Sequence, residues 1–422
     1  LLIFFGVPVP FGFLASIIFF STLKGIDYSF LFPIGFSNIN SVVLLSMPFF
    51  ILTGYLVSKG SIATRLIDLA DAIVGRLPGG LGLVVIVVSA VFGAISGAAA
   101  SSVVAIGTIM IPEMEKRGYP RGYSAALVAS SSVLSVLIPP SMAMIMYAFL
   151  TGQSVAACFL STVGPGILLS IFFGIANAIM VKNIPTVQVS PKRPFNEHIR
   201  ILKAKSKRAL SALGLPILIL GGIYGGIMTP TEAAAASAVY CFVLSVLIYR
   251  EIKMREACVL LRSSAVNSGA MMIMTFFAAI LGRLYTMEQV PQLIAQALFG
   301  ITQNKLLLLL LVNIILILVG MVVDMISGVL LITPILFPVI LSMGIQPLHF
   351  AAIVGTNLSM GMLTPPMAGI LYIGAKTGEV SVDKMLKPVF AFILFCFVPV
   401  IIITSYWPTL SLFLPRLMGF VK

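Results

Sequence analysis

Apolar residues occur in blocks along most of the chain, with short polar segments between them. A helical block of about 20 apolar residues is long enough to cross a lipid bilayer. The predicted membrane spans are residues 1–23, 42–58, 155–181, 209–228, 233–249, 267–285 and 389–412. In residues 61–77 and 288–303 the apolar side chains recur at helical spacing among polar ones, which predicts amphipathic helices at the membrane interface.

Two apolar blocks are longer than a simple span and are predicted to be re-entrant helical hairpins. Residues 81–111 could form one tilted helix, but the run of Gly, Ala and Ser from Gly93 to Gly107 favours a hairpin. Small residues let such a turn pack inside protein at membrane depth. Residues 306–342 form the second candidate hairpin, with Asp324 near its expected turn.

Two more spans each contain a pair of prolines and are predicted to be broken helices. Pro139-Pro140 lies within residues 123–150, and Pro365-Pro366 lies within residues 349–374. Proline lacks a backbone N–H and keeps the residue before it out of the helical region. Each proline pair should therefore interrupt its helix near mid-membrane.

The chain contains an internal repeat. When it is shifted by 226 positions, the difference between 365 and 139, the two proline pairs coincide, as do Pro112 with Pro338 and Gly118 with Gly344. Residues 1–184 and 227–410 are therefore two copies of one unit, and each copy is predicted to make four crossings. The single span between the copies inverts the second copy relative to the first, which is the plan of many secondary transporters.

Composition confines the chain to the class of multi-pass membrane proteins. Of its 422 residues, 59% are hydrophobic and 9% charged, and the mean hydropathy is +1.14. The predicted fold class is therefore an all-α polytopic membrane protein with inverted repeats, two re-entrant hairpins and two broken helices. Two His and four scattered Cys provide neither a metal-binding spacing nor a disulfide framework.

The net charge of +13 arises from basic residues in short loops, so it indicates membrane orientation and excludes nucleic acid as a partner. Residues 182–208 alone carry eight Lys or Arg against one Glu. The basic loops fall on one side, predicted to be cytoplasmic, which places the N-terminus in the cytoplasm and the C-terminus on the periplasmic side. The first residues have no basic segment and no small-residue cleavage site, so they do not indicate a signal peptide. The basic loops are residues 59–76, 116–121, 182–208, 250–262 and 376–387.

The hairpin turns and the helix breaks are the candidate sites for chemistry. Carbonyls at the ends of half-helices, together with hydroxyl groups, suit a hard cation, and half-helix N-termini suit an anion. Candidate cation site 1 consists of Ser96, Gly97, Ser101, Ser102, Pro139 and Ser141. Candidate cation site 2 consists of Asp324, Ser327, Gly328, Asn357, Thr364 and Pro365. The candidate substrate-binding residues are Ser102, Ser131, Ser141, Asp324 and Thr364.

Each of these residues also has a purely structural interpretation. Serines in membrane helices often serve only to let helices pack closely. Asp324 could instead form an ion pair with Arg283, although a carboxylate in an apolar hairpin is usually functional. Asn267, Asn313 and Asn357 are equally well explained as hydrogen-bonding residues between helices.

Several short motifs, in order, resemble the large membrane subunit of the tripartite ATP-independent periplasmic (TRAP) transporters, the DctM or SiaM type. The resemblance covers essentially the whole chain. Its motifs are the Gly93 to Gly107 run, Met110-Ile111-Pro112-Glu113-Met114, Arg117-Gly118-Tyr119-Pro120, Ile138-Pro139-Pro140-Ser141, Gly320-Met321 with Asp324, and Leu363-Thr364-Pro365-Pro366. Many members have two serines directly after the glycine at the first turn, whereas Gly97 here is followed by three alanines, which favours backbone carbonyls as ligands there.

The resemblance implies a sodium-driven importer of a small organic anion in the bacterial inner membrane, working by an elevator mechanism with at least two Na+ ions. It also implies two partners, a small four-helix membrane subunit (Q type) and a soluble periplasmic binding protein (P type). Residues 1–80 and 229–304 would form the scaffold with its in-plane arm helices. Residues 81–184 and 305–422 would form the two halves of the transport domain, the latter with the last span, and residues 185–228 the basic linker and connector helix.

Other functions are weighed against this one. A stand-alone sodium/carboxylate symporter would share the architecture but need no binding protein. An intramembrane enzyme is disfavoured because the sequence has no HExxH motif, no pair of membrane aspartates and no Ser/His pairing at depth. A passive channel fits poorly with two occluding hairpins. No arginine lies at the predicted site, so carboxylates, sialic acid and sulfonates all remain possible substrates.

Overall fold

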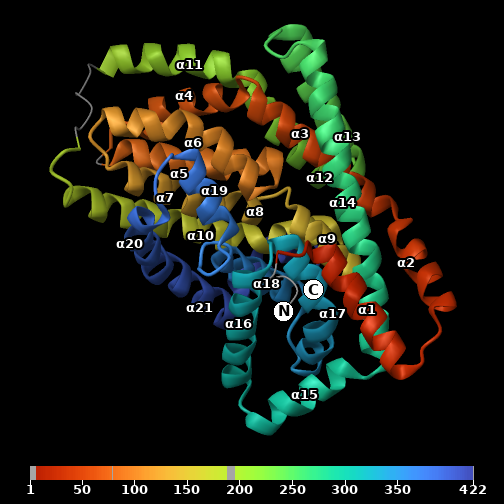
Figure 1. Ribbon diagram of the computed structural model, residues 1–422. Coiled ribbons are helices and arrows are strands. Elements are labelled where there is room, and N and C mark those ends of the chain that lie inside the picture. The colour runs from red at the N-terminus through yellow and green to blue at the C-terminus, as the bar shows by residue number, and fades with distance from the viewer. Residues whose placement is uncertain (1–5, 78, 188–194, 422) are drawn as a thin grey trace.

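The computed structural model describes residues 6–77, 79–187 and 195–421, and within these ranges the regular elements are all helical, with no strand. Nine of the described helices are long and apolar enough to cross a membrane. These observations confirm the all-α polytopic fold class. Figure 1 shows the arrangement of the helices.

The first repeat contains two apolar segments, an amphipathic helix, a hairpin, a broken helix and a long span. Its elements are α1 (Val9–Lys24), η2 (Tyr28–Phe30), α2 (Leu31–Ile39), η3 (Val42–Leu45), α3 (Ser46–Lys59), α4 (Ile62–Val74), α5 (Gly80–Ser96), α6 (Ala99–Lys116), α7 (Arg121–Ser132), α8 (Leu134–Leu137), α9 (Met142–Thr151) and α10 (Val155–Lys182).

The connector and the second repeat follow. The connector is α11 (Phe195–Pro216), η4 (Ile217–Gly221) and α12 (Gly222–Tyr224). The second repeat is α13 (Pro230–Phe242), η5 (Val243–Ile248), α14 (Met254–Met287), α15 (Val290–Ile301), α16 (Lys305–Val322), α17 (Met325–Ser342), α18 (Pro347–Gly361), α19 (Gly369–Thr377), α20 (Val382–Phe392), η6 (Ile393–Phe397), α21 (Val398–Tyr406) and α22 (Pro408–Leu417).

The helices reproduce the repeat found in the sequence. Helices α6 and α17 begin and end 226 residues apart, at 99 and 116 and at 325 and 342. Packing between the copies is reciprocal, because α3 packs on α13 while α1 packs on α14, and α6 packs on α19 while α17 packs on α9. Reciprocal contacts of this kind indicate a pseudo-two-fold axis between the copies. In Figure 1 the hairpins α5–α6 and α16–α17 lie in different parts of the molecule, with α18 between them.

Both hairpins and both helix breaks occur where the sequence predicts them, but several boundaries were wrong. Helix α2 was not predicted. In the second repeat one continuous helix, α14, corresponds to both α2 and α3, and it begins at Met254 and not at residue 267. The first turns of α14 contain basic residues, so this segment is not continuously apolar although it is helical. In the first repeat the polar run from Asn38 to Ser41 interrupts the same helix, since Asn and Ser side chains compete for backbone hydrogen bonds.

Two further differences concern the connector and the last span. Helix α11 begins at Phe195, within the segment predicted to be a basic linker. The last span covers residues 382–406 and not 389–412. It ends where Trp407 leaves the helical conformation, with φ −121° and ψ 84°, and Pro408 starts the separate helix α22.

The amphipathic helices are held by charged side chains of other segments. Glu251, in the loop after η5, accepts a hydrogen bond of 2.8 Å from the backbone N–H of Ser61 and pairs with Arg65 at 3.4 Å. Partial burial opposes ionisation, but the bonds from Ser61 and Arg65 together hold the pKa of Glu251 below its usual value. At the equivalent place in the other copy, Lys24 pairs with Glu288 at 2.8 Å. The start of each amphipathic helix is thus close to a charged residue at or just after the end of the first helix of the other copy.

Helix α4 is covered by protein to a greater extent than an interfacial helix would be. It packs on both α5 and α11, and its residues Ile62 and Leu66 are buried. Lys205 of α11 pairs with Asp68 at 3.2 Å and with Asp71 at 3.3 Å. The connector helix therefore covers the amphipathic helix of the first repeat.

The close approach of α16 and α18 depends on two glycines. A Cβ atom on Gly361 would lie 2.4 Å from the backbone carbon of Gly320, a separation that real Cβ atoms do not show. We expect Gly361→Ala to separate the two helices and to lower the free energy of unfolding by about 1–3 kcal/mol. Thermal unfolding of the purified protein measures this. The control is Gly269→Ala in α14, where a Cβ meets nothing within 4 Å; an equal loss of stability in both variants would contradict the prediction.

Candidate functional site

The turn of the first hairpin rests directly on the first helix break. Gly97 joins α5 to α6 with φ +61°, a conformation that L side chains rarely adopt. A Cβ atom there would lie 2.5 Å from the carbonyl oxygen of Pro140, so only glycine fits. One turn earlier, a Cβ on Gly93 would lie 2.6 Å from the Cα of Ser135. The hairpin and the broken helix therefore meet as the sequence predicts.

The break itself is a short extended segment between α8 and α9. Ile138 has φ −93° and ψ 122°, and Ser141 has φ −125° and ψ 120°. Ser141 occupies the N-cap position of α9, but its side chain makes no capping hydrogen bond. Pro139 and Pro140 cannot donate backbone hydrogen bonds. The break thus has extended backbone and a hydroxyl, that of Ser141, which does not cap α9.

Buried hydroxyl groups without hydrogen-bond partners lie on the hairpin and along the broken helix. A buried hydroxyl without a protein partner is costly, so such a group is available to bond a solute or water. The unpartnered hydroxyls are those of Ser96, Ser102, Ser130 and Ser141. By contrast, Ser101 donates to Ala98 O at 2.9 Å, and Ser131 to Leu127 O at 2.6 Å. Of the candidate ligands in site 1, Ser96, Ser102 and Ser141 are therefore the available hydroxyls.

A cavity of about 460 Å³ lies between the first hairpin and the helices α3 and α14. Sequence reasoning missed Tyr55 and Ser58 of α3 and Met271 of α14 as parts of this site, because only the tertiary packing brings these helices to the hairpin. No charged residue is among its described lining residues. These are Ile51, Gly54, Tyr55, Ser58, Ser96, Ala98, Ala100, Ser101, Val104, Met142, Asn267 and Met271.

The polar groups of the cavity wall are neutral and partly engaged with one another. Asn267 donates its amide to the hydroxyl of Tyr55, which joins α14 to α3. Ser58 donates to Gly54 O at 2.7 Å. Ser96 lines the cavity with a hydroxyl that has no partner. The interhelical interpretation of Asn267 is therefore correct, and the residue also contributes to the cavity wall.

The second hairpin meets the second break in a similar way. The backbone N–H of Met367, within the break, donates to Met321 O near the end of α16 at 3.2 Å. Thr364 donates to Met360 O at 2.9 Å, within its own helix end. Gly328 packs against Leu358 of α18. The two candidate sites thus share one plan, in which a hairpin turn contacts the residues around a proline pair.

Asp324 is the N-cap of α17. Its carboxylate accepts hydrogen bonds from the backbone N–H groups of Ile326 at 3.1 Å and Ser327 at 3.3 Å, and from the Ser327 hydroxyl. Within the described ranges no ion pair joins it to Arg283, and the residue is exposed at the hairpin turn. The structure therefore adds a capping role that neither sequence interpretation included.

Asn357 belongs to a buried polar network between three helices. Its amide nitrogen donates to Asn313 Oδ1 and to Ile353 O, both at 2.8 Å. Ser405 of α21 donates to the same Asn313 oxygen at 3.0 Å. The interhelical interpretation of Asn313 and Asn357 is therefore correct, while the Oδ1 atom of Asn357 is buried and has no partner.

The two candidate sites differ in charge. Under the repeat offset of 226, the difference between 327 and 101, Ser101 corresponds to Ser327 and Ala98 corresponds to Asp324. The first hairpin thus has a methyl group where the second has a carboxylate. Site 1 presents neutral oxygen atoms only, and site 2 adds one negative charge.

Paired hairpins that meet broken helices, in two copies related by a pseudo-two-fold axis, define a membrane transport protein of the repeat-built class. The sequence profile described as "Tripartite ATP-independent periplasmic transporter, DctM component" matches residues 1–410. The chain belongs to this family, whose members are transporter permeases and not enzymes.

Curated relatives agree with this assignment. The chain is 34% identical to the isethionate TRAP transporter permease protein DctMQ of Oleidesulfovibrio alaskensis, over 97% of this chain and 64% of that protein. It is 34% identical to the C4-dicarboxylate TRAP transporter large permease protein DctM of Pseudomonas aeruginosa, over 91% and 88% of the two chains. It is 31% identical to the sialic acid TRAP transporter large permease protein SiaM of Vibrio cholerae, over 99% and 96%. The chain thus spans just under two thirds of the first relative and most of the other two.

One solved structure shares the fold. The YdaH transporter of Alcanivorax borkumensis, whose crystal structure is described as having an unusual topology, aligns with a TM-score of 0.60. The alignment covers 92% of this chain and 88% of that one at 13% sequence identity. At this identity the likeness concerns the fold alone.

The capping role of Asp324 can be separated from its charge. Asn is as good an N-cap as Asp, whereas Ala removes the cap at a cost of about 1 kcal/mol. We therefore expect Asp324→Ala to lower the thermal unfolding midpoint and Asp324→Asn to leave it close to wild type. Equal destabilisation by both substitutions would show that the carboxylate charge, and not the cap, stabilises the hairpin.

Proposed function

We propose that this chain imports a small organic anion across the bacterial inner membrane, driven by an inward sodium gradient. The observation that carries this proposal is the cavity of about 460 Å³ at the turn of the first hairpin, because its size lies in the range of small-molecule sites. The relatives named above act on isethionate, C4-dicarboxylates and sialic acid, all of which are organic anions. The same class of substrate is proposed here.

The neutral cavity wall gives a physical reason for coupling to a cation. An anion that enters a site without charged residues loses its hydration and gains no counter-charge. A sodium ion bound about 4 Å away would return about 4 kcal/mol at an effective dielectric constant of about 20. Ser96 lies both on the cavity wall and in candidate cation site 1, so such a neighbour is available. Anion and sodium would then bind tightly only together.

Two sodium sites are proposed, one at each junction of hairpin and break. Sodium, like other hard cations, prefers oxygen ligands. Site 1 would use the free hydroxyls of Ser96, Ser102 and Ser141 with backbone carbonyls near Pro139. Site 2 would use Asp324 with the oxygen atoms of Asn357 and Thr364.

The elevator mechanism is also a proposal, and the cavity supports it. The cavity has one wall from α3 and α14 and the other from the first hairpin and α9. We assign α1 to α4 and α13 to α15 to a fixed scaffold, and the hairpins with the broken helices to a moving body. Movement of this body past α3 and α14 would carry the hairpin side of the cavity, with its bound ions, from one membrane face to the other.

The proposed partners are a P-type periplasmic binding protein that delivers the substrate and a Q-type small membrane subunit beside the scaffold. The runner-up function is a stand-alone sodium/carboxylate symporter. The family assignment favours the tripartite system, and the two differ in one measurable way, since only the tripartite system needs the binding protein.

The coupling proposal predicts uptake that depends on sodium. In liposomes that contain the chain with its Q-type subunit, the loaded binding protein and an inward sodium gradient should produce accumulation of the substrate. Collapse of the gradient, or omission of the binding protein, should abolish it. Asp324→Asn keeps the helix cap but removes the charge, so we expect its sodium dependence to shift to at least tenfold higher concentration. Uptake that is unaffected by collapse of the gradient would disprove the coupling.

The proposed orientation predicts the labelling of one cysteine. Cys258, near the start of α14, is exposed, whereas Cys158, Cys241 and Cys396 are buried. If the basic segment at residues 250–262, which includes the start of α14, is cytoplasmic, a membrane-impermeant maleimide should label Cys258 in inside-out vesicles and not in intact spheroplasts. Cys258→Ser is the control for background labelling. Labelling in intact spheroplasts alone would invert the proposed topology.

A further inference from the structure

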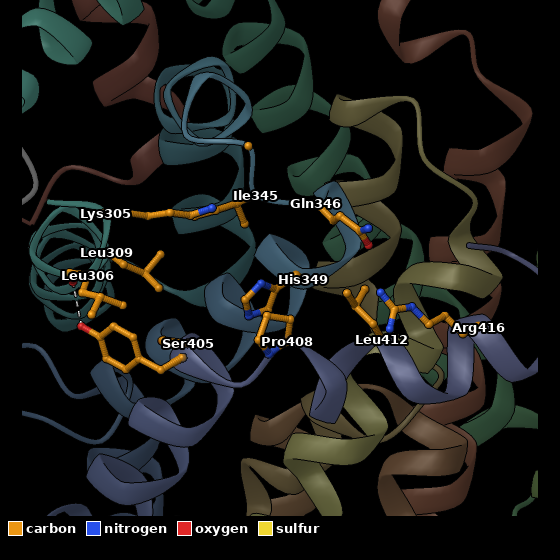
Figure 2. A pocket seen from close by; sticks show the side chains of 12 residues that line it. Lys305, Leu306, Leu309, Ile345, Gln346, His349, Ser405, Pro408, Leu412 and Arg416 are labelled. Carbon is orange, nitrogen blue, oxygen red and sulfur yellow. Dashed lines mark hydrogen bonds between the residues drawn. The ribbon is translucent and has the colours of Figure 1, made fainter. Parts of the chain in front are cut away.

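A second pocket, of about 330 Å³, has none of the candidate ion-site residues in its lining and carries an uncompensated positive charge. Figure 2 shows His349 of α18 at its centre, with Lys305 of α16 and Arg416 of α22 reaching in from either side. No acidic residue is among its described lining residues. Over the described ranges, neither the Lys305 side chain nor the Arg416 side chain has an ion-pair or hydrogen-bond partner.

The corresponding pocket of the other repeat contains acidic as well as basic residues. It is lined by Pro120, Tyr123 and Met180, which correspond to Gln346, His349 and Tyr406 under the offset of 226, the difference between 349 and 123. Three basic residues, Arg121, Lys384 and Lys387, line it together with two acids, and Arg121 pairs with Glu115 at 3.3 Å and with Glu379 at 3.1 Å. The second repeat has retained the pocket but has no acids in it.

The shape of the pocket is set by internal bonds of His349 and Tyr406, which leave the side chains of Lys305 and Arg416 free. His349 Nε2 lies 2.8 Å from Thr404 O, which fixes the ring between α18 and α21. Tyr406 donates to Leu306 O at 2.9 Å and closes one side. Helix α22 contributes Pro408, Leu412 and Arg416, four residues apart and hence on one face.

Two helices also begin at this pocket without a side-chain cap. Gln346 precedes α18 and Trp407 precedes α22, and neither side chain caps its helix. Their N–H groups add a partial positive charge to that of the side chains. The pocket therefore favours an anion with several acceptor oxygens, as a phosphate group has.

The surroundings of the pocket indicate that this phosphate belongs to a lipid. Lys305 begins the span α16, and Tyr406 ends the span α21, so the pocket lies at the end of two membrane crossings. Leu306 lines the pocket and is 61% exposed, and Leu310, one turn further along α16, is 44% exposed. Trp407, beside the mouth, is 63% exposed, as is typical of an aromatic residue at the membrane interface.

We propose that the pocket formed by Lys305, His349 and Arg416 binds the phosphate of an anionic phospholipid whose acyl chains lie along the exposed leucines of α16. The lipid joins α16, α18 and the C-terminal helix α22. Because Lys305 is the first residue of α16, the bound headgroup stabilises the start of the second hairpin.

The test uses the full chain purified in a neutral detergent. It is titrated with phosphatidylglycerol and, separately, with inorganic phosphate. Binding is measured by the shift of the thermal unfolding midpoint. We expect phosphatidylglycerol to raise the midpoint of the wild type. Its apparent Kd should weaken roughly thirtyfold in Lys305→Gln/Arg416→Gln, because each basic residue near a membrane surface contributes a factor of about five. The single variants, expected to weaken binding about fivefold each, serve if the double variant does not fold.

The control is Lys59→Gln/Arg262→Gln, which removes the same charge from two exposed positions elsewhere and should keep wild-type affinity. Equal weakening in the control, or unchanged affinity in the pocket variants, would overturn the site. Inorganic phosphate that binds as tightly as the lipid would overturn the assignment to a lipid. A wild type that the lipid does not stabilise would overturn the proposal and favour a carboxylate of a partner protein. None of these readouts depends on transport.

Discussion

The need to satisfy backbone polar groups at membrane depth determines most of this architecture. A helix that breaks inside a bilayer exposes carbonyl and amide groups that lipid cannot bond, so protein or solute must approach them. In both copies a hairpin turn does so: Gly97 rests on Pro140, and Met367 bonds to Met321. A larger side chain at Gly97 would collide with Pro140, which explains the small residue there. The sites available to ions are the groups that this mutual contact leaves free, and they are few.

The two copies use this plan with different chemistry. The first hairpin leaves neutral hydroxyls unpartnered beside a neutral cavity, and the second uses a carboxylate that also caps its helix. Neutral oxygens hold a cation weakly unless an anion lies close by, whereas a carboxylate attracts one alone. If both proposed sites bind sodium, the second would fill first and the first would fill together with the anion. This difference arises from one position of the repeat, Ala98 against Asp324, and does not require different folds.

Much of the fold could be predicted from the sequence because its signals are local. Proline pairs, the small-residue run and the repeat offset depend on neighbouring residues or on self-similarity, and they located both hairpins and both breaks. The predicted helix boundaries were wrong where a helix does not coincide with an apolar block. Helix α14 is helical through its basic first turns, and α22 is a separate helix after the tryptophan that ends a span. The cavity wall from Tyr55 and Ser58 could not be predicted, because it depends on packing between distant helices. Sequence alone also could not distinguish Ser96, whose hydroxyl is free, from Ser131, whose hydroxyl bonds its own helix.

The interrupted helix of the first repeat has a consequence for energetics. In one copy the segment is split into α2 and α3, and in the other it is the continuous helix α14. If two copies related by a two-fold axis were identical, the two end states of a transport cycle would be related by that rotation and would have equal free energy. Every departure from the repeat therefore acts as a bias on that equilibrium, and a bias of 1.4 kcal/mol changes the ratio of the two states about tenfold. The split helix and the unequal charges of the two pockets are such departures, so the differences between the copies determine which conformation is favoured at rest.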